Sequence, residues 1–400
     1  MLKRTDGPAF VATLGMLAAV TATAIDISIP AQPKIAQDFG AAPGAGGAIV
    51  TAYLLGFGAG QMVWGLLADR FGRLAPLYVS LVCFVVASIV CAITDSFTLL
   101  LVARGVQGVM GSAAPVIARA IARDQGGGIR SARLLSTMTI IVGLAPLLAP
   151  TVGSGLLTLF AWPAIFWFLA TFGGIALLCA VVVVPETLQH ADQAALSLRR
   201  ILAGAATLFR SPDFVGGVAV TSSIFFGYAS LLAIGAAVAD VRYGVPPEAF
   251  GPVFAIAAAA FLVGSTTART LAGKYGIERV LVCGGILAAS VGVAMLALSA
   301  AEPGLPVLWA GVAAYVAAFG SLMPAGTAKA LEPAGGMAGL GSSLIGTSNM
   351  LAGVAGSVLA VQLFDGSHRA LTMVMAGGAL MAATAVLVGV MNRRRRAGDG

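Results

Sequence analysis

The chain has 400 residues, of which 59% are hydrophobic and only 10% are charged. Because soluble domains carry roughly 25% charged residues, this composition and a mean hydropathy of +0.97 exclude an ordinary water-soluble protein and indicate one that crosses a membrane many times. The formal net charge of +7 does not indicate nucleic acid as a partner, because topology and anionic lipid headgroups account for basic residues between membrane spans.

Apolar runs of about 20 residues, the length that an α-helix needs to cross a bilayer, recur along the whole chain. Runs such as "MTIIVGLAPLLAP" are apolar on every side, whereas the strands of a membrane β-barrel alternate. We therefore expect an all-α integral membrane protein with twelve transmembrane helices in two pseudo-symmetric six-helix bundles. The predicted spans are residues 8–30, 44–67, 74–93, 97–120, 134–157, 163–184, 213–238, 249–268, 279–300, 305–328, 338–363 and 369–391.

The distribution of basic residues predicts the orientation of these spans. An even number of spans puts both termini on one side, and nineteen of the 23 Lys and Arg residues then lie on that side. Only Lys34, Arg242 and Arg369 fall on the other side, and Arg104 falls inside the fourth span. Because Lys and Arg concentrate in cytoplasmic loops, we expect both termini to be cytoplasmic.

The longest connection divides the chain into two halves. We predict an N-terminal bundle of residues 1–184, a cytoplasmic linker of residues 185–212 and a C-terminal bundle of residues 213–400. An internal repeat supports this division, because "LADRFGR" (67–73) resembles "LAGKYGI" (271–277) at an offset of 204 residues. Two such halves are typical of transporters that bind substrate near the middle of the membrane. The linker could form a surface helix with four apolar side chains facing lipid: Leu196, Leu198, Ile201 and Leu202.

Two ionisable residues, Asp26 and Arg104, stand out inside the predicted spans. A charge at the centre of a bilayer costs about 2.5–3.5 kcal/mol on insertion scales, so both should face the bundle interior or water. Asp26 is our candidate for the group that carries a proton, because burial disfavours a charged carboxylate whereas a nearby cation such as Arg104 favours it. The alternatives are a boundary carboxylate near Pro30 and Pro33 for Asp26, and a structural bridge to backbone carbonyls for Arg104.

Other chemistries find little support in the sequence. His190 and His368 fall in loops, and the predicted spans hold no grouping of catalytic side chains. The four cysteines lie in apolar runs without the paired spacing of metal ligands. We therefore expect no enzyme and no cofactor, with the proton as the coupling ion, and keep a membrane-embedded enzyme or a non-transporting sensor as weaker alternatives.

Polar and aromatic residues of the spans are candidates for substrate contact, because pockets for drug-like molecules are mostly apolar with a few polar anchors. Each of them could instead serve packing alone. The candidates are Tyr53, Gln61, Gln107, Phe225, Phe226, Tyr228 and Asn349.

The loop between the second and third spans contains a charged cluster. Asp69 could accept hydrogen bonds at a helix N-terminus, and Arg70 and Arg73 could pair with a carboxylate such as Asp124. Such a cluster would hold the cytoplasmic helix ends together, although the basic residues could also be purely topological. Close approach would be permitted by Gly65, near the end of the second span, and by Gly72 in the loop.

The fifth span contains a pattern of Gly and Pro. Pro146 and Pro150 each remove a helical hydrogen bond, and Gly143 and Gly153 permit close helix packing. We expect this span to be kinked and tightly packed.

Three of these stretches resemble signatures of the major facilitator superfamily. "GQMVWGLLADRFGRLAPL" (60–77) is similar to its loop between helices 2 and 3, "LLLVARGVQGVMGSAAPVIARAIARD" (99–124) to its helix 4 signature, and the fifth span to its antiporter signature. The resemblance implies the major facilitator fold. It also implies that the Gly, Pro and loop residues named above take part in gating.

The similarity narrows to the Bcr/CflA-type drug:proton antiporters, through "DISIPAQPKIAQDF" (26–39), "YGVPPEAFGPVFAI" (243–256) and "MPAGTAKAL" (323–331). The resemblance implies export of small amphiphilic compounds across a bacterial inner membrane in exchange for protons. Asp26 would then carry the proton or face the substrate, and Arg104 would tune the protonation of Asp26. We expect a monomer in the lipid bilayer. The alternative is a proton-coupled uptake symporter. The sequence departs from the family pattern at four positions: Ala18, Leu74, Met110 and Asn349.

Overall fold

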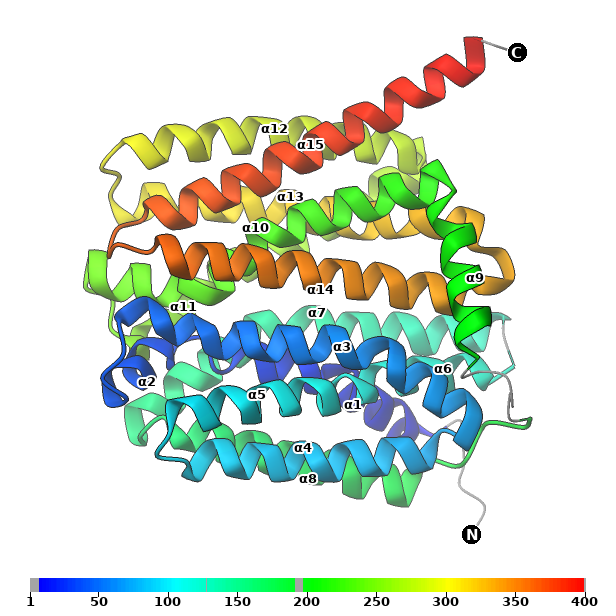
Figure 1. Ribbon diagram of the computed structural model, residues 1–400, viewed down its shortest axis with the longest axis horizontal. Helices are drawn as coiled ribbons and strands as arrows, with labels where there is room; N and C mark the ends of the chain where they lie inside the picture. Colours follow the sequence, from blue (N-terminus) through cyan, green and yellow to red (C-terminus); the bar gives the residue numbers. More distant parts are fainter. Residues whose placement is uncertain (1–6, 127, 191–196, 399–400) are drawn as a thin grey trace.

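The structure is a computed structural model that describes residues 7–126, 128–190 and 197–398, with side chains described as far as residue 392. Long α-helices lie side by side along one common direction (Figure 1). In chain order the elements are α1 (Pro8–Asp26), α2 (Gln32–Asp38), η1 (Pro43–Gly47), α3 (Ala48–Phe71), α4 (Leu74–Ile93), α5 (Phe97–Gly111), α6 (Ala113–Asp124), α7 (Gly128–Leu159), α8 (Pro163–Val183), α9 (Leu198–Phe209), α10 (Pro212–Tyr243), α11 (Pro247–Tyr275), α12 (Ile277–Ala300), α13 (Leu305–Leu331), η2 (Glu332–Met337), α14 (Ala338–Leu363) and α15 (Arg369–Gly398).

The described residues contain eleven stretches that are long and apolar enough to cross a membrane. One of them, Leu305–Leu363, is 59 residues long and consists of α13 and α14 joined by η2. The backbone turns sharply there, at Gly335 with φ 49° and ψ −125°. With α5 and α6 counted as the single stretch Phe97–Asp124, the described residues form twelve membrane-length segments, which confirms the predicted fold class.

The first span differs from its prediction. We expected one helix over residues 8–30, but α1 ends at Asp26 and the short helix α2 begins only at Gln32. The physical reason is Pro30, because a proline ring clashes with the carbonyl four residues earlier, which here belongs to Asp26. The candidate carboxylate thus occupies the last position of a helix, beside a break in the backbone.

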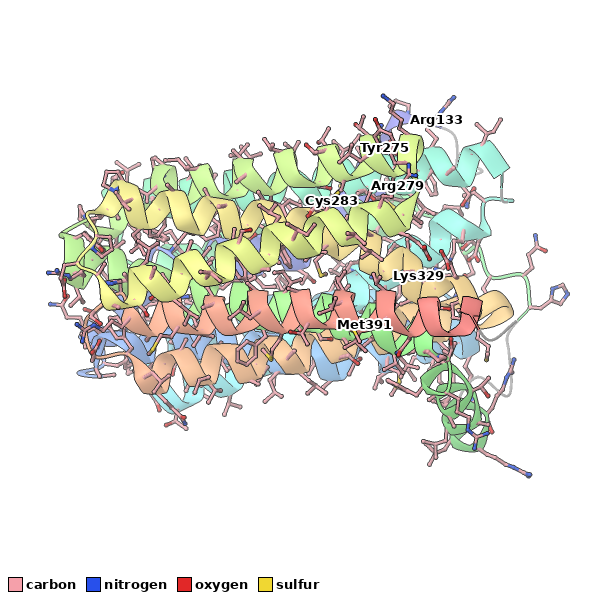
Figure 2. All side chains as sticks on the ribbon, turned by 90° about the horizontal axis from the view of Figure 1, so that it is seen from above. Arg133, Tyr275, Arg279, Cys283, Lys329 and Met391 are labelled. Carbon is pink, nitrogen blue, oxygen red and sulfur yellow. The ribbon has the colours of Figure 1, made fainter. Side chains whose placement is uncertain are left out.

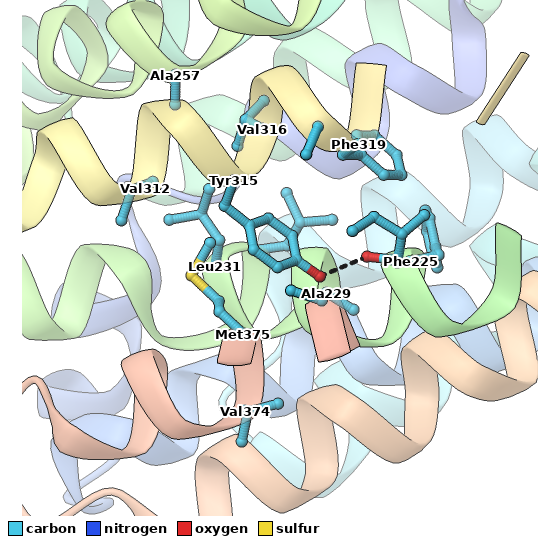
Figure 3. Packing of buried hydrophobic residues seen from close by; sticks show 14 of the residues in the cluster. Phe225, Ala229, Leu231, Ala257, Val312, Tyr315, Val316, Phe319, Val374 and Met375 are labelled. Atoms are coloured by element: carbon cyan, nitrogen blue, oxygen red, sulfur yellow. Dashed lines mark hydrogen bonds between the residues drawn. The ribbon is translucent and has the colours of Figure 1, made fainter. Parts of the chain in front are cut away.

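Two large hydrophobic clusters form most of the interior of the described residues, beside a small third one at α9. The first is built from the helices α1–α8 and includes Leu14, Phe84 and Phe166. The second is built mainly from α10–α15 and also takes in Ile29, Val50 and Leu54 from the N-terminal part. Figure 3 shows part of this second cluster, where Tyr315 of α13 donates a hydrogen bond of 2.8 Å to the carbonyl of Ile224 in α10. Two separately folded halves would each need such a cluster as a packed interior. The boundaries 1–184, 185–212 and 213–400 stay a prediction.

The repeat found in the sequence recurs in the backbone. Gly72 lies between α3 and α4 with φ 90° and ψ 164°, and Gly276 lies between α11 and α12 with φ 84° and ψ 159°. These φ values are readily adopted only by glycine. The two helix pairs, 204 residues apart, are therefore joined by the same turn.

The two ends of the bundle differ in charge. α1 begins and α15 ends at the end where α9 runs across the bundle, which we call the inner end (Figure 1). Arg133, Arg279 and Lys329 gather there (Figure 2). The opposite end, with α2, is called the outer end. Lys3, Arg4 and Leu196, which we used in the topology and linker predictions, lie outside the described residues, and the orientation in the membrane stays a prediction.

Candidate functional site

Asp26 is buried at the junction of the two halves. Its side chain is 4% exposed, and within the described ranges no hydrogen bond or ion pair reaches its carboxylate. The preceding Ile25 packs against both hydrophobic clusters, and Ile29 belongs to the second one. The phenol of Tyr228 on α10 lies within electrostatic range of the carboxylate. Because a buried anion without a partner is costly, gain or loss of a proton at Asp26 changes the energy of this junction strongly.

Arg104 on α5 is fully buried but does not contact Asp26. Its guanidinium donates hydrogen bonds to the Ile49 carbonyl (3.3 Å), the Ala24 carbonyl (3.2 Å) and the Ser28 hydroxyl (3.3 Å). Ala24 and Ser28 flank Asp26 by two residues on each side, so Arg104 holds the end of α1 in place. These contacts are the ones expected if Arg104 forms a structural bridge to backbone carbonyls. The predicted influence of Arg104 on the proton at Asp26 would therefore act through the backbone in this conformation.

Two of the predicted substrate contacts instead surround Arg104. Gln107 accepts a hydrogen bond of 2.5 Å from Arg104 and donates one of 2.6 Å to Ser88 on α4. The ring of Tyr53 lies 4.5 Å from the guanidinium carbon, a cation–π distance. Both side chains are fully buried. Their predicted role in substrate binding stays a prediction, and here they support the cation that anchors α1.

Aromatic side chains from three helices of the C-terminal half pack together around Phe319. Tyr228 stacks on Phe319 of α13 with 4.3 Å between ring centroids, and Phe225 lies 6.0 Å from both rings. Phe261 of α11 lies 5.5 Å from Phe319. We call these four residues the aromatic cluster. Tyr228 and Phe261 are only partly buried, so two rings of the cluster remain accessible.

Phe261 and Phe319 were missed at the sequence level, and Phe226 takes part in none of the ring contacts seen among the described residues. The available signal was the spacing of Tyr315 and Phe319, which are four residues apart and therefore share a helix face. The helices that would meet this face could not be known from the sequence.

The remaining two candidates lie on α3 and α14. Asn349 is 4% exposed and accepts a hydrogen bond of 3.0 Å from Ser222 of α10. Gln61 lies against Gly346 of α14, and its buried Oε1 has no partner among the described residues. Gln61 therefore brings an amide to the junction of the halves, whereas Asn349 is bonded within the C-terminal half, and the binding role of both residues stays a prediction.

The Gly and Pro residues of the fifth span lie where α7 contacts both the α1 break and α11. Pro146 and Pro150 are inside the continuous helix α7. A side chain at Gly153 would collide with the carbonyl of Ile27, directly after Asp26, and one at Gly143 would touch Leu262 of α11. This is the close packing that the sequence predicts, and it connects the α1 break to the C-terminal half.

The charged loop residues form a network at the inner end. Arg73 donates from Nε and Nη2 to the two carboxylate oxygens of Asp124 at 2.9 and 3.3 Å, as predicted, and also pairs with Asp69. Burial favours the neutral form of Arg73, but Asp124 and Asp69 outweigh it and raise the pKa of this guanidinium. Arg70 lies over the ring of Phe71. Gly65 faces Val116 of α6.

Glu186, directly after α8, joins this network and was missed at the sequence level. Its carboxylate accepts hydrogen bonds from the backbone N–H groups of Arg73 (3.1 Å) and Leu74 (3.0 Å), at the start of α4. Thr187 donates to Asp124 at 2.7 Å. Partial burial acts to raise the pKa of Glu186, but the donated backbone hydrogen bonds prevail and the pKa lies below its usual range. The network thus connects the ends of α3, α4, α6 and α8.

Replacing Glu186 by alanine should destabilise the inner end. Loss of a helix-capping side chain costs about 1 kcal/mol, so the melting temperature in detergent should fall. Because the folded-state pKa is below the unfolded one, the contribution of Glu186 is complete above the unfolded pKa of about 4.3 and is lost as the pH falls. The difference between wild type and Glu186→Ala should therefore shrink below pH 4. A constant difference would contradict this role, and Glu186→Gln, which retains one acceptor, should lie between them.

Polar contacts between the halves close the outer end. Lys34 of α2 forms an ion pair with Glu248 at the start of α11. Gln32 donates a hydrogen bond of 2.8 Å to the carbonyl of Leu232 in α10. Next to Glu248, the carbonyl of Pro247 accepts a hydrogen bond of 2.8 Å from Ser154 of α7. The structure is therefore held shut at the end where α2 lies.

Replacing Lys34 by glutamine should open the outer end more often, because the ion pair with Glu248 that connects the two halves is lost. The measurement is the rate at which a cysteine at the buried position Val50 reacts with a membrane-impermeant maleimide, in a chain whose native cysteines are replaced by serine. The rate should rise severalfold in Lys34→Gln and stay near the wild-type rate in Lys34→Arg. Equal rates in all three proteins would exclude a gating role for this pair.

Known proteins share this architecture. The family model described as Major Facilitator Superfamily matches residues 14–357. The chain is 27% identical over 357 residues to the bicyclomycin resistance protein homolog of Haemophilus influenzae, covering 89% of this chain and 90% of that one. It is 32% identical over 163 residues to the multidrug resistance protein MdtL of Escherichia coli, covering 41% and 42% of the two chains. The crystal structure of the nucleoside transporter NupG is similar in fold, with a TM-score of 0.73 at 15% identity over 95% of this chain and 99% of that one. The chain belongs to the Major Facilitator Superfamily.

Proposed function

We propose that this protein exports small amphiphilic organic compounds in exchange for protons, by alternating access of a site between its two halves. The observation that carries the proposal is Asp26, a buried carboxylate without a partner among the described residues, placed at a helix break where both hydrophobic clusters meet. Such a group can take up a proton when one end of the bundle is open and release it when the other end opens.

Side chains in the interior of the bundle suit an amphiphilic substrate. The aromatic cluster supplies ring faces, and Gln61 and Asn349 supply amides, which together match the mostly apolar lining with few polar anchors of drug-binding sites. We expect the proton to be the only coupling ion and expect no cofactor.

We propose that the protein works in a bacterial inner membrane. The relatives reported above come from bacteria, and the basic residues at the inner end favour cytoplasmic termini. We propose that the protein works as a monomer embedded in lipid.

The main alternative is a proton-coupled symporter that takes up its solute. The fold is shared with a nucleoside transporter and does not set the direction of transport. Export is favoured because both curated relatives reported above carry the word resistance in their names.

The test is survival of an efflux-deficient bacterium that produces the protein, compared with an empty vector, across a broad panel of antibiotics and dyes. Export predicts a higher tolerated concentration of at least one compound, which everted membrane vesicles should then accumulate when energised with a proton gradient. Increased sensitivity to a compound would indicate uptake instead. No difference for any compound would remove the support for drug export and point to a metabolite as substrate.

A further inference from the structure

The linker helix α9 (Leu198–Phe209) is amphipathic but is not part of the proposed transport site. Its packed face is formed by Gly204, against Leu340 of α14, and by Leu208, which is 1% exposed within a cluster with Phe214 and Ile345. α9 is therefore firmly attached to the inner ends of α10 and α14.

A second face of α9 is apolar and exposed. Leu198, Leu202 and Phe209 are 66%, 59% and 46% exposed. At 3.6 residues per turn these three side chains fall within about 40° of one another around the helix axis. Ile201, which the sequence led us to place on the lipid-facing side, is only partly exposed and lies nearer the packed face.

A basic stripe follows directly beside the apolar one. Arg199 and Arg210 are exposed and fall within about 20° of each other, on the side of the apolar stripe that is away from the packed face. Arg200 points about 100° further round the helix. An apolar stripe bordered by arginines is the pattern of a helix that lies in the headgroup layer of a membrane.

The position of α9 matches this pattern. The helix runs across the direction of the membrane-length helices at the inner end, and it stands out from the side of the bundle (Figures 1 and 2). A helix attached there lies along the plane of the membrane surface. Its apolar stripe can therefore enter the acyl boundary while its arginines remain at headgroup level.

We propose that α9 is a binding surface for anionic phospholipid, with Leu198, Leu202 and Phe209 among the acyl chains and with Arg199 and Arg210 on headgroup phosphates. The occupant is the membrane leaflet, because acyl chains and phosphates together complement both stripes, whereas a soluble phosphate would leave the apolar one exposed. The inference goes beyond transport and does not depend on the substrate.

The first test uses the full-length protein in detergent, titrated with phosphatidylglycerol or with phosphatidylcholine. Phosphatidylglycerol should raise the melting temperature more than phosphatidylcholine does. In the double variant Arg199→Gln/Arg210→Gln, the concentration of phosphatidylglycerol needed for half of this effect should rise about tenfold, since each basic residue contributes to attraction by anionic lipid. Arg200→Gln is the matched control and should respond like wild type, and all proteins should melt alike without lipid.

Three outcomes would overturn the proposal in this test, and the first two concern the lipids. One is an equal response of the wild type to the two lipids, and another is an unchanged response of the double variant. The third is an equal response to inorganic phosphate, which would indicate a phosphate site rather than a membrane surface.

A second test measures burial of the apolar stripe in the membrane. In vesicles containing phosphatidylglycerol, a cysteine at Leu202 should react several times more slowly with a water-soluble maleimide than one at Thr207, on the opposite face. The difference should persist when the protein is diluted into more lipid. Equal rates would contradict the proposal, and protection lost on dilution would indicate a second copy of the chain as the occupant.

Discussion

Asp26→Asn is expected to abolish export driven by a proton gradient while leaving the protein folded. Asparagine has nearly the same shape but cannot exchange a proton, so the site between the halves keeps its packing and loses its link to the gradient. One proton moving across 100 mV provides about 2.3 kcal/mol, equivalent to roughly a 50-fold substrate gradient. Everted vesicles carrying Asp26→Asn should therefore accumulate no substrate above equilibrium.

The matching control is Asp365→Asn, which makes the same chemical change in the connection between α14 and α15 at the outer end. It should accumulate substrate as wild type does. Exchange of labelled for unlabelled substrate without a gradient should continue in Asp26→Asn, because alternating access itself does not require the proton to be carried. Full gradient-driven accumulation by Asp26→Asn would exclude this residue as the coupling group.

Arg104→Lys is expected to reduce transport at least tenfold although the positive charge is kept. A lysine ammonium lacks the planar fork that reaches Ala24, Ser28 and Ile49 together. Each buried acceptor left without a donor costs about 1–3 kcal/mol, so the end of α1 that bears Asp26 should become mobile. We therefore expect Arg104 to act as a positioning residue for the carboxylate.

The distinguishing measurement is the pH dependence of transport. Loosening the end of α1 changes the surroundings of Asp26, so the pH of half-maximal transport should move in Arg104→Lys, with wild-type amounts of protein in the membrane. Arg242→Lys, at the outer end of α10, is the control and should leave both rate and pH profile unchanged. A lower rate with an unchanged pH profile would assign Arg104 a structural role only.

The sequence was sufficient for the membrane spans because the bilayer imposes their length. The predicted starts at residues 74, 163, 305, 338 and 369 coincide with those of α4, α8, α13, α14 and α15. The pairing of Arg73 with Asp124 could also be anticipated, since both residues fall at the same end of neighbouring spans.

What could not be predicted depends on contacts between distant segments. The aromatic cluster joins α10, α11 and α13, and no sequence period shows which helix faces meet. Glu186 looked like part of a polar linker, because the backbone N–H groups it accepts from belong to residues more than a hundred positions earlier. The end of α1 at Asp26 was missed, although Pro30 was a local signal for it.

The most direct test of the account is proton movement during transport by the purified protein in sealed liposomes containing a pH-sensitive dye. With wild-type protein and no imposed gradient of pH, adding a substrate found by the survival panel on one side should drive protons in the opposite direction. With Asp26→Asn the same addition should move substrate without moving protons. Proton movement of wild-type size in Asp26→Asn, or none in the wild type while substrate crosses, would contradict the claim that Asp26 couples export to protons.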